Sequence, residues 1–175
     1  MAKKEKKMVY KVKTSLDYHY HKINRNLYLV LWLFLAVLMI SILVPFGLRG
    51  DIANPVPLWS LLGGYLGFIS VLFLPFIIYY EVRTIQIRRI KDLVFSEVKL
   101  SNMVDDSIGN IMKIHFVVDL VYEGQPLQKE TEDIFFTRSI FPNAVAADYL
   151  NQIVTVGYSP SHNELLVFPL PNVEA

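Results

Sequence analysis

Two long runs of apolar residues dominate the first half of the chain. The first, residues 26–48, contains 23 positions without a charged side chain, and the second, residues 52–80, contains 29. A helix needs about 20 apolar residues to cross the hydrocarbon core of a bilayer. The first run also lacks the polar stripe of a helix on a soluble domain. The pattern therefore predicts two transmembrane helices, at about 27–48 and 58–80.

A cleaved signal sequence is the alternative for the first run. The apolar core of a signal is about 7–15 residues long and is followed by small residues at the cleavage site. This run is longer and ends in Val44-Pro-Phe-Gly-Leu48, a poor cleavage site. We therefore favour a helix that is retained.

The segment between the two runs, residues 49–57, contains a glycine, an asparagine and two prolines, all turn formers. A link this short predicts an antiparallel hairpin. Lys and Arg number eight in residues 1–25, one in the link and four in residues 81–92. Because Lys and Arg accumulate on the cytoplasmic side, we expect a multi-pass protein of the plasma membrane with both termini in the cytoplasm.

One face of the second helix carries a row of small residues: Ser60, Gly63, Gly67 and Ser70. Between helices in lipid there is no hydrophobic force, so close approach over small residues drives their association. We expect a helix-packing surface here. It receives either the first helix of the same chain or, through the second transmembrane helix, a protein partner or a second copy.

Residues 81–92 predict a linker helix that leaves the membrane, although the alternation of Ile85 and Ile87 also fits a strand. Its basic side chains are Arg83, Arg88, Arg89 and Lys91. We expect them at the lipid headgroups, where anionic lipid of the cytoplasmic leaflet attracts each one by ~1 kcal/mol. The basic segment 1–25 is interpreted in the same way, as a topology and lipid signal and not as a nucleic-acid-binding segment.

From residue 93 onward the apolar positions alternate, as in strands. In the clearest strand, 111–122, the even-numbered side chains are all apolar or aromatic, whereas the odd-numbered ones include Lys113, His115 and Asp119. Such alternation is typical of an antiparallel sheet with one packed face. Other expected elements are strands at 93–100 and 127–136, turns at 102–110 and 123–126, a short helix at 142–150, and a closing hairpin at 152–158 and 164–168.

The predicted fold class is therefore α+β. A two-helix transmembrane hairpin is followed by a small antiparallel β-sheet domain, residues 93–170, with one short helix, and by a tail at 171–175.

The closing hairpin, Val154-Thr-Val-Gly-Tyr-Ser-Pro160 followed by Leu165-Leu-Val167, resembles the end of a bacterial membrane-associated β-domain family of unknown function. Members end in a valine-rich strand, a Tyr-x-Pro, a polar turn and a last apolar strand. This chain departs from them at Asn151, where glycine is usual, and at Ser161-His-Asn163, which lacks a second proline. The resemblance covers roughly residues 93–170 and implies a small β-domain tied to membrane helices, with no catalytic residues to carry over.

Few side chains point to chemistry. Cysteine is absent, which excludes disulfides and thiolate nucleophiles, and no phosphate loop, nucleophile elbow or His-Glu metal helix is present. The remaining candidates lack a completing ligand or base and are interpreted as surface or turn residues: His115, His19 with His21, Asp105 with Asp106, and Glu130, Glu132 and Asp133. We expect no catalytic residue, no metal and no cofactor.

Three functional hypotheses follow. The leading one is a non-enzymatic bacterial membrane protein whose cytoplasmic β-domain binds or regulates a protein partner, as an accessory subunit. The second is an immunity protein that protects the producing cell from a membrane-active secreted toxin. The third is a subunit of a composite enzyme. A pump or transporter acting alone is disfavoured, because neither apolar run contains an ionisable residue other than tyrosine.

Overall fold

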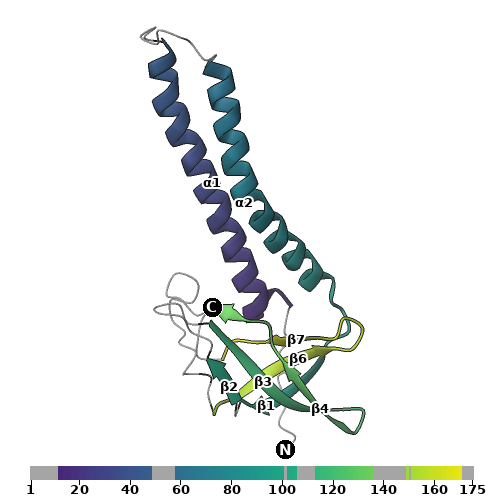
Figure 1. Ribbon diagram of the computed structural model, residues 1–175. Helices are drawn as coiled ribbons and strands as arrows, with labels where there is room; N and C mark the ends of the chain where they lie inside the picture. The colour runs from purple at the N-terminus through teal and green to yellow at the C-terminus, as the bar shows by residue number, and fades with distance from the viewer. Residues whose placement is uncertain are drawn as a thin grey trace, which may run out of the picture. The chain divides into compact units, whose positions relative to one another are not determined.

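The computed structural model describes residues 12–48, 58–100, 102–105, 113–135, 149 and 151–170. The chain forms two compact units, one of Met1–Tyr20 with Thr84–Ala175 and the other of His21–Arg83. The helices are η1 (Val12–Thr14), α1 (Leu16–Leu48) and α2 (Leu58–Arg89). The strands are β1 (Val94–Lys99), β2 (Asn102–Asp105), β3 (Lys113–Tyr122), β4 (Gln125–Glu130), β5 (Ile134–Phe135), β6 (Ile153–Ser159) and β7 (Glu164–Val167) (Figure 1).

Both helices predicted from the apolar runs are present, and each extends beyond its run. α1 begins at Leu16 and α2 ends at Arg89, so the polar segments that flank the runs continue the helices. The helix predicted for the linker at 81–92 is confirmed as far as Arg89, where it forms the last part of α2, and a short connection to β1 follows. The strand alternative for this segment is wrong.

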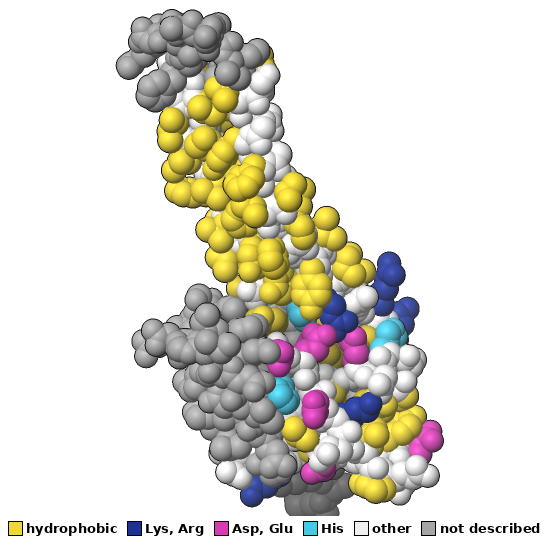
Figure 2. Space-filling view, viewed as in Figure 1, with side chains coloured by type: hydrophobic (Ala, Val, Ile, Leu, Met, Phe, Trp, Pro, Cys, Tyr) yellow, Lys and Arg dark blue, Asp and Glu magenta, His cyan; other side chains and the backbone are white. Residues whose placement is uncertain are grey.

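The helices are long and apolar enough to cross a membrane. In the most apolar stretch of each helix, only 6% of the residues of α1 and 11% of those of α2 are buried. Large apolar side chains are instead exposed, among them Phe34 at 59%, Phe68 at 62% and Val71 at 75% (Figure 2). The core helix of a soluble protein would bury such side chains.

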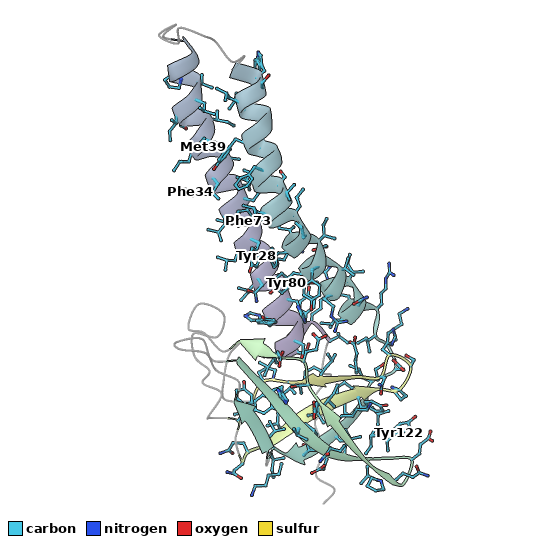
Figure 3. All side chains as sticks on the ribbon, viewed as in Figure 1. Tyr28, Phe34, Met39, Phe73, Tyr80 and Tyr122 are labelled. Atoms are coloured by element: carbon cyan, nitrogen blue, oxygen red, sulfur yellow. The ribbon has the colours of Figure 1, made fainter. Side chains whose placement is uncertain are left out.

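Within the unit His21–Arg83, α1 and α2 contact each other through aromatic rings. Tyr28 stacks on Phe76 and on Tyr80, with ring centroids 5.1 and 5.7 Å apart. Tyr28 and Tyr80 are labelled in Figure 3. The apolar side chains buried in this unit are Ala36, Leu62 and Ile69. These residues define the stripe on which the two helices pack.

The predicted antiparallel β-structure consists of two sheets. Sheet A has the strand order β1-β6-β7, and sheet B has the order β2-β3-β4 with β5 also beside β3. All pairings in both sheets are antiparallel. The rings of Tyr122 in β3 and Tyr158 in β6 meet edge to face at 5.5 Å, which joins the two sheets.

Part of the segment predicted as a turn, 102–110, is a strand. In β2, Met103 and Val104 pair with Phe116 and His115 of β3. Pairing with a long neighbouring strand outweighs the turn preference of the asparagine and aspartates around them. The remainder of the segment lies outside the described residues, as does the helix predicted at 142–150 apart from Tyr149.

The third predicted strand, 127–136, is broken at Thr131. Its amide donates to the carbonyl of Phe116 at 3.0 Å, and its Oγ1 accepts the amide of Phe116 at 2.9 Å. The side chain thus replaces a main-chain carbonyl where β4 ends. The strand resumes as β5, so the prediction placed strand structure correctly but missed the break.

The alternation predicted for β3 is confirmed. Phe116, Val118 and Leu120 are at most 5% exposed, whereas Val121 on the other face is 68% exposed. The strands of sheet A contribute buried valines of their own: Val154, Val156 and Val167.

A second hydrophobic cluster lies on Leu166 and Phe168 at the end of sheet A. The residues that join them are Tyr18 from α1, Ile87 from α2 and Ile90 after it, with Val12 and Leu93 packed against the cluster. Leu166 and Val167 point to opposite faces of the sheet, because successive strand side chains alternate. Sheet A is therefore apolar on both faces, and the unit extends beyond residues 93–170 to include the first turn of α1 and the last turn of α2.

Two connections depend on left-handed backbone. Glu123 and Gly124 have φ of 51° and 79°, as in the type I′ turn that joins two strands in a tight hairpin. The turn is therefore narrower than the predicted 123–126, since Gln125 and Pro126 already belong to β4. Asn151 has φ of 64°, a conformation that glycine adopts freely and asparagine tolerates. This explains how the chain accommodates asparagine at that position.

Gly157 in β6 is a close-packing site, and we predict that Gly157→Val destabilises the protein by about 1–3 kcal/mol, as overpacking does. A Cβ at this position would lie 3.2 Å from both Leu93 Cδ2 and Phe168 Cε2. Urea unfolding of the full chain in detergent measures the effect. The control Ile153→Val, in the same strand at a side chain that is 66% exposed, should change stability by less than about 0.5 kcal/mol. Equal midpoints for both variants would show that Leu93 and Phe168 move aside freely.

Candidate functional site

The row of small residues on α2 is the first predicted site. Ser70 contacts α1, since its Oγ accepts a hydrogen bond from Trp32 Nε1 at 3.2 Å. Gly63 and Gly67 do not, because a Cβ at either position would meet no atom within 4 Å. Ser60 and both glycines are exposed. The structure therefore shows contact with α1 at Ser70 and not at the glycines, and packing of the glycines against another helix stays a prediction.

The predicted headgroup residues fall into different environments. Arg89 and Lys91 are exposed, and Arg83 is half-buried. Arg88 is exposed as well, but its Nε and Nη2 donate to Tyr18 Oη at 3.0 and 2.7 Å. Its guanidinium carbon lies 5.4 Å from the centre of the same ring. Arg88 thus joins the end of α2 to the start of α1, a role that the sequence did not indicate.

The first turn of α1 is bound to sheet A. Ser15 caps the helix, with its Oγ accepting the amide of Tyr18 at 3.2 Å, an interaction worth about 1 kcal/mol. Asp17, which is 3% exposed, accepts the amide of Val167 through Oδ2 at 3.1 Å. Because β7 is an edge strand, this carboxylate occupies the position of a neighbouring strand's carbonyl.

A polar cluster joins the connection after α2 to the turn between β6 and β7. Asp92 accepts Ser159 Oγ through Oδ1 at 2.7 Å and the amide of Ser161 through Oδ2 at 3.0 Å. His162 Nδ1 lies 2.7 Å from Ser161 Oγ, 3.1 Å from Ser159 Oγ and 3.8 Å from Asp92 Oδ1. Hydrogen bonds from Ser161 and Ser159 hold the pKa of the Asp92 carboxyl well below its usual range.

Serine, histidine and aspartate in one cluster raise the question of a catalytic triad. In a triad the serine and the carboxylate bond to different nitrogens of the imidazole, so that a proton passes through a correctly oriented ring. Here both hydroxyls and the carboxylate of Asp92 face the same atom, Nδ1 of His162. The geometry fixes the turn and does not activate a serine.

The other histidines and acids lie apart from this cluster. His115 Nδ1 is 3.5 Å from Asp133 Oδ1, and its side chain is 17% exposed, so it is more buried than a free surface histidine. His19 and His21 lie on a helix, where positions two apart point in different directions. The acids Glu130, Glu132 and Asp133 are exposed, as predicted. Among the described residues no group of three or more His, Asp or Glu could hold a metal ion.

The polar turn at 159–163 was visible in the sequence, but its partner was not. Asp92 is 67 positions from Ser159, and the only local signal is a carboxylate just before the first strand.

No protein-family model, curated protein or solved structure matches this chain.

We predict that Asp92→Asn destabilises the protein in a pH-dependent manner. Since the pKa of Asp92 is lowered in the folded state, its ionised form adds stability that is fully present above the unfolded value of about 3.9 and is lost as the pH falls further. The variant should therefore unfold at lower urea than the wild type at pH 7, and the gap should narrow below pH ~4. A gap of the same size at pH 7 and pH 3 would contradict the role of the charge. Glu97→Gln, an exposed acid on β1, serves as control.

Proposed function

We propose that this chain is a two-pass membrane protein with no chemistry of its own, which binds or regulates a protein partner as an accessory subunit. The observation that carries the proposal is the exposed apolar surface of α1 and α2. In water such a surface is unfavourable by roughly 25 cal/mol per Å², and a bilayer removes that cost.

The ends of the apolar runs support insertion of the helices as a hairpin. Arg25 immediately precedes the first run and Glu81 immediately follows the second, and the two form an ion pair, Nη1 to Oε2, at 2.5 Å. Polar character therefore begins at the same level on both helices. Tyr79 and Tyr80 lie at this level in the sequence, as tyrosines do at membrane interfaces, and Arg89 and Lys91 beyond it are available to anionic headgroups.

Association with a partner helix is supported by the glycine face. Gly63 and Gly67 are one turn apart and turned away from α1, and such a pair allows two backbones to approach closely and gain dispersion contacts. We propose that a helix of a partner protein or of a second copy packs there. No feature of the described residues favours an immunity protein or a composite enzyme over this more general role.

The orientation is tested with single cysteines at Ala53 and Ser161 in this otherwise cysteine-free chain. With both termini in the cytoplasm, an impermeant thiol reagent added to intact cells should label Ala53→Cys and not Ser161→Cys. Permeabilised cells should label both, which controls for reactivity. The opposite pattern in intact cells would invert the topology, and labelling of both would exclude a two-pass arrangement.

The partner surface is tested with the double variant Gly63→Ile and Gly67→Ile in mild detergent. Because a Cβ at these positions meets no atom of the described residues within 4 Å, the hairpin should fold and resist protease as the wild type does. Crosslinked dimers, or a co-purified partner identified by mass, should fall at least about tenfold, which corresponds to ~1.4 kcal/mol.

Leu72→Phe is the control for added bulk, since Leu72 is 48% exposed and, nine residues after Gly63 at about 3.6 residues per turn, lies on the opposite side of the helix. It should leave association unchanged. Equal association in the double variant and the wild type would exclude the glycine face as the contact.

A further inference from the structure

The proton positions around His162 follow from the donors and acceptors that meet there. Ser159 has one hydroxyl hydrogen, and the ionised carboxylate of Asp92 can only accept, so this hydrogen lies on Asp92 Oδ1 at 2.7 Å. Of the two lone pairs of Ser159 Oγ, one accepts the amide of His162 at 3.4 Å and the other is left for His162 Nδ1 at 3.1 Å. Ser159 is fully buried, which fixes this geometry.

Neutral and protonated His162 use these neighbours differently. In the neutral ring one nitrogen accepts and the other donates, and Ser161 Oγ at 2.7 Å from Nδ1 is the hydroxyl placed to donate to it. In the protonated ring both nitrogens carry hydrogen. Nδ1–H then donates to the two hydroxyl oxygens that face it, Ser161 Oγ and Ser159 Oγ. Because Ser159 Oγ donates to Asp92, a hydrogen-bonded path joins the positive ring to the negative carboxylate. Charge-assisted hydrogen bonds are stronger than neutral ones.

The other charged and titratable groups around the turn leave Asp92 as the partner. From β4, Lys129 Nζ donates a hydrogen bond to Asn163 Oδ1 at 2.5 Å and lies 6.0 Å from the centre of the Tyr158 ring in β6. From β3, Tyr122 contacts that same ring. The remaining charges near the turn in sequence are Glu164 at the start of β7 and Lys91 before Asp92. Only Asp92 has a charged oxygen within 4 Å of His162 Nδ1 among the ion pairs of the described residues.

We propose that His162 is a proton-operated latch, which tightens the β6–β7 turn on the connection between α2 and β1 when the pH falls. Histidine is the side chain that ordinarily changes charge between pH 5 and 8. The latch lies at the segment where the chain passes from α2 into the β-domain.

The test is amide hydrogen exchange of the full chain in detergent micelles at pH 5.5 and 7.5, with each rate corrected for its intrinsic pH dependence. The Ser161 amide, which donates to Asp92, reports the latch. Its protection should be about two- to fivefold higher at pH 5.5 in the wild type, the size of one exposed ion pair.

Two variants assign the effect. His162→Gln should abolish the pH dependence of the Ser161 amide protection. Ser159→Ala should also abolish it, because it removes the hydroxyl that links His162 to Asp92. His115→Gln, the matched change at the histidine beside Asp133, should keep it. A pH dependence that persists in His162→Gln, or that disappears in His115→Gln, would overturn the latch. A pH dependence that persists in Ser159→Ala alone would contradict the hydrogen-bonded path through the Ser159 hydroxyl.

A measurement on the wild type does not depend on the folding of any variant. The ¹⁵N shifts of the His162 ring should show an unprotonated Nδ1 where the Ser161 amide is less protected, and hydrogen on both nitrogens where that amide is more protected. An Nδ1 that already carries hydrogen where that amide is less protected would contradict the proposal.

Discussion

The β-domain depends on the hydrogen bond that the buried carboxylate of Asp17 accepts from the amide of Val167. β7 has only four residues and pairs with β6 on one side, so this amide would otherwise be a buried donor without an acceptor, at a cost of about 1–3 kcal/mol. Once the first turn of α1 is held there, the ring of Tyr18 is fixed in the cluster with Leu166 and Phe168. Arg88 can then reach Tyr18, which brings the end of α2 into the same unit.

This arrangement has a consequence for folding. The hydrogen bond joins residues 150 positions apart, and contacts of such separation slow folding because closing a long loop costs entropy. Leu16, Tyr18 and Tyr20 are each at most 5% exposed, and burial of a large apolar side chain contributes roughly 1.5–3 kcal/mol. The first turn of α1 is therefore a structural part of the β-domain. Without this helical turn, the strands would expose one apolar face of sheet A.

What the sequence predicted well is what depends on local pattern. The apolar runs identified both helices, the alternation of β3 identified its buried face, and Glu123-Gly124 identified a tight turn. The predictions failed where a distant segment decides the structure, as at β2, which is a strand only because β3 lies beside it.

The candidate sites show the same division. The small-residue face of α2 and the basic residues after it were found from spacing and charge, which are local. The environment of each was not, because a one-dimensional pattern cannot show that Gly63 turns away from α1 or that Arg88 binds Tyr18. Asp17 and Asp92 were missed entirely, since a single aspartate at the end of a helix gives no sign of a partner in the last two strands.

Three acids in or beside the helices therefore share one physical role. Asp17, Glu81 and Asp92 each accept hydrogen bonds from a group far away in the chain: the amide of Val167, the guanidinium of Arg25 and the turn at 159–161. In the membrane orientation that we propose, acids at these positions would be repelled by an anionic leaflet unless their charge were compensated. Pairing each with a donor inside its own unit removes that conflict and leaves Arg89 and Lys91 to interact with the headgroups. The three acids thus stabilise the fold within their own units, and the basic residues and the glycine face are left for the lipid and partner contacts that we propose.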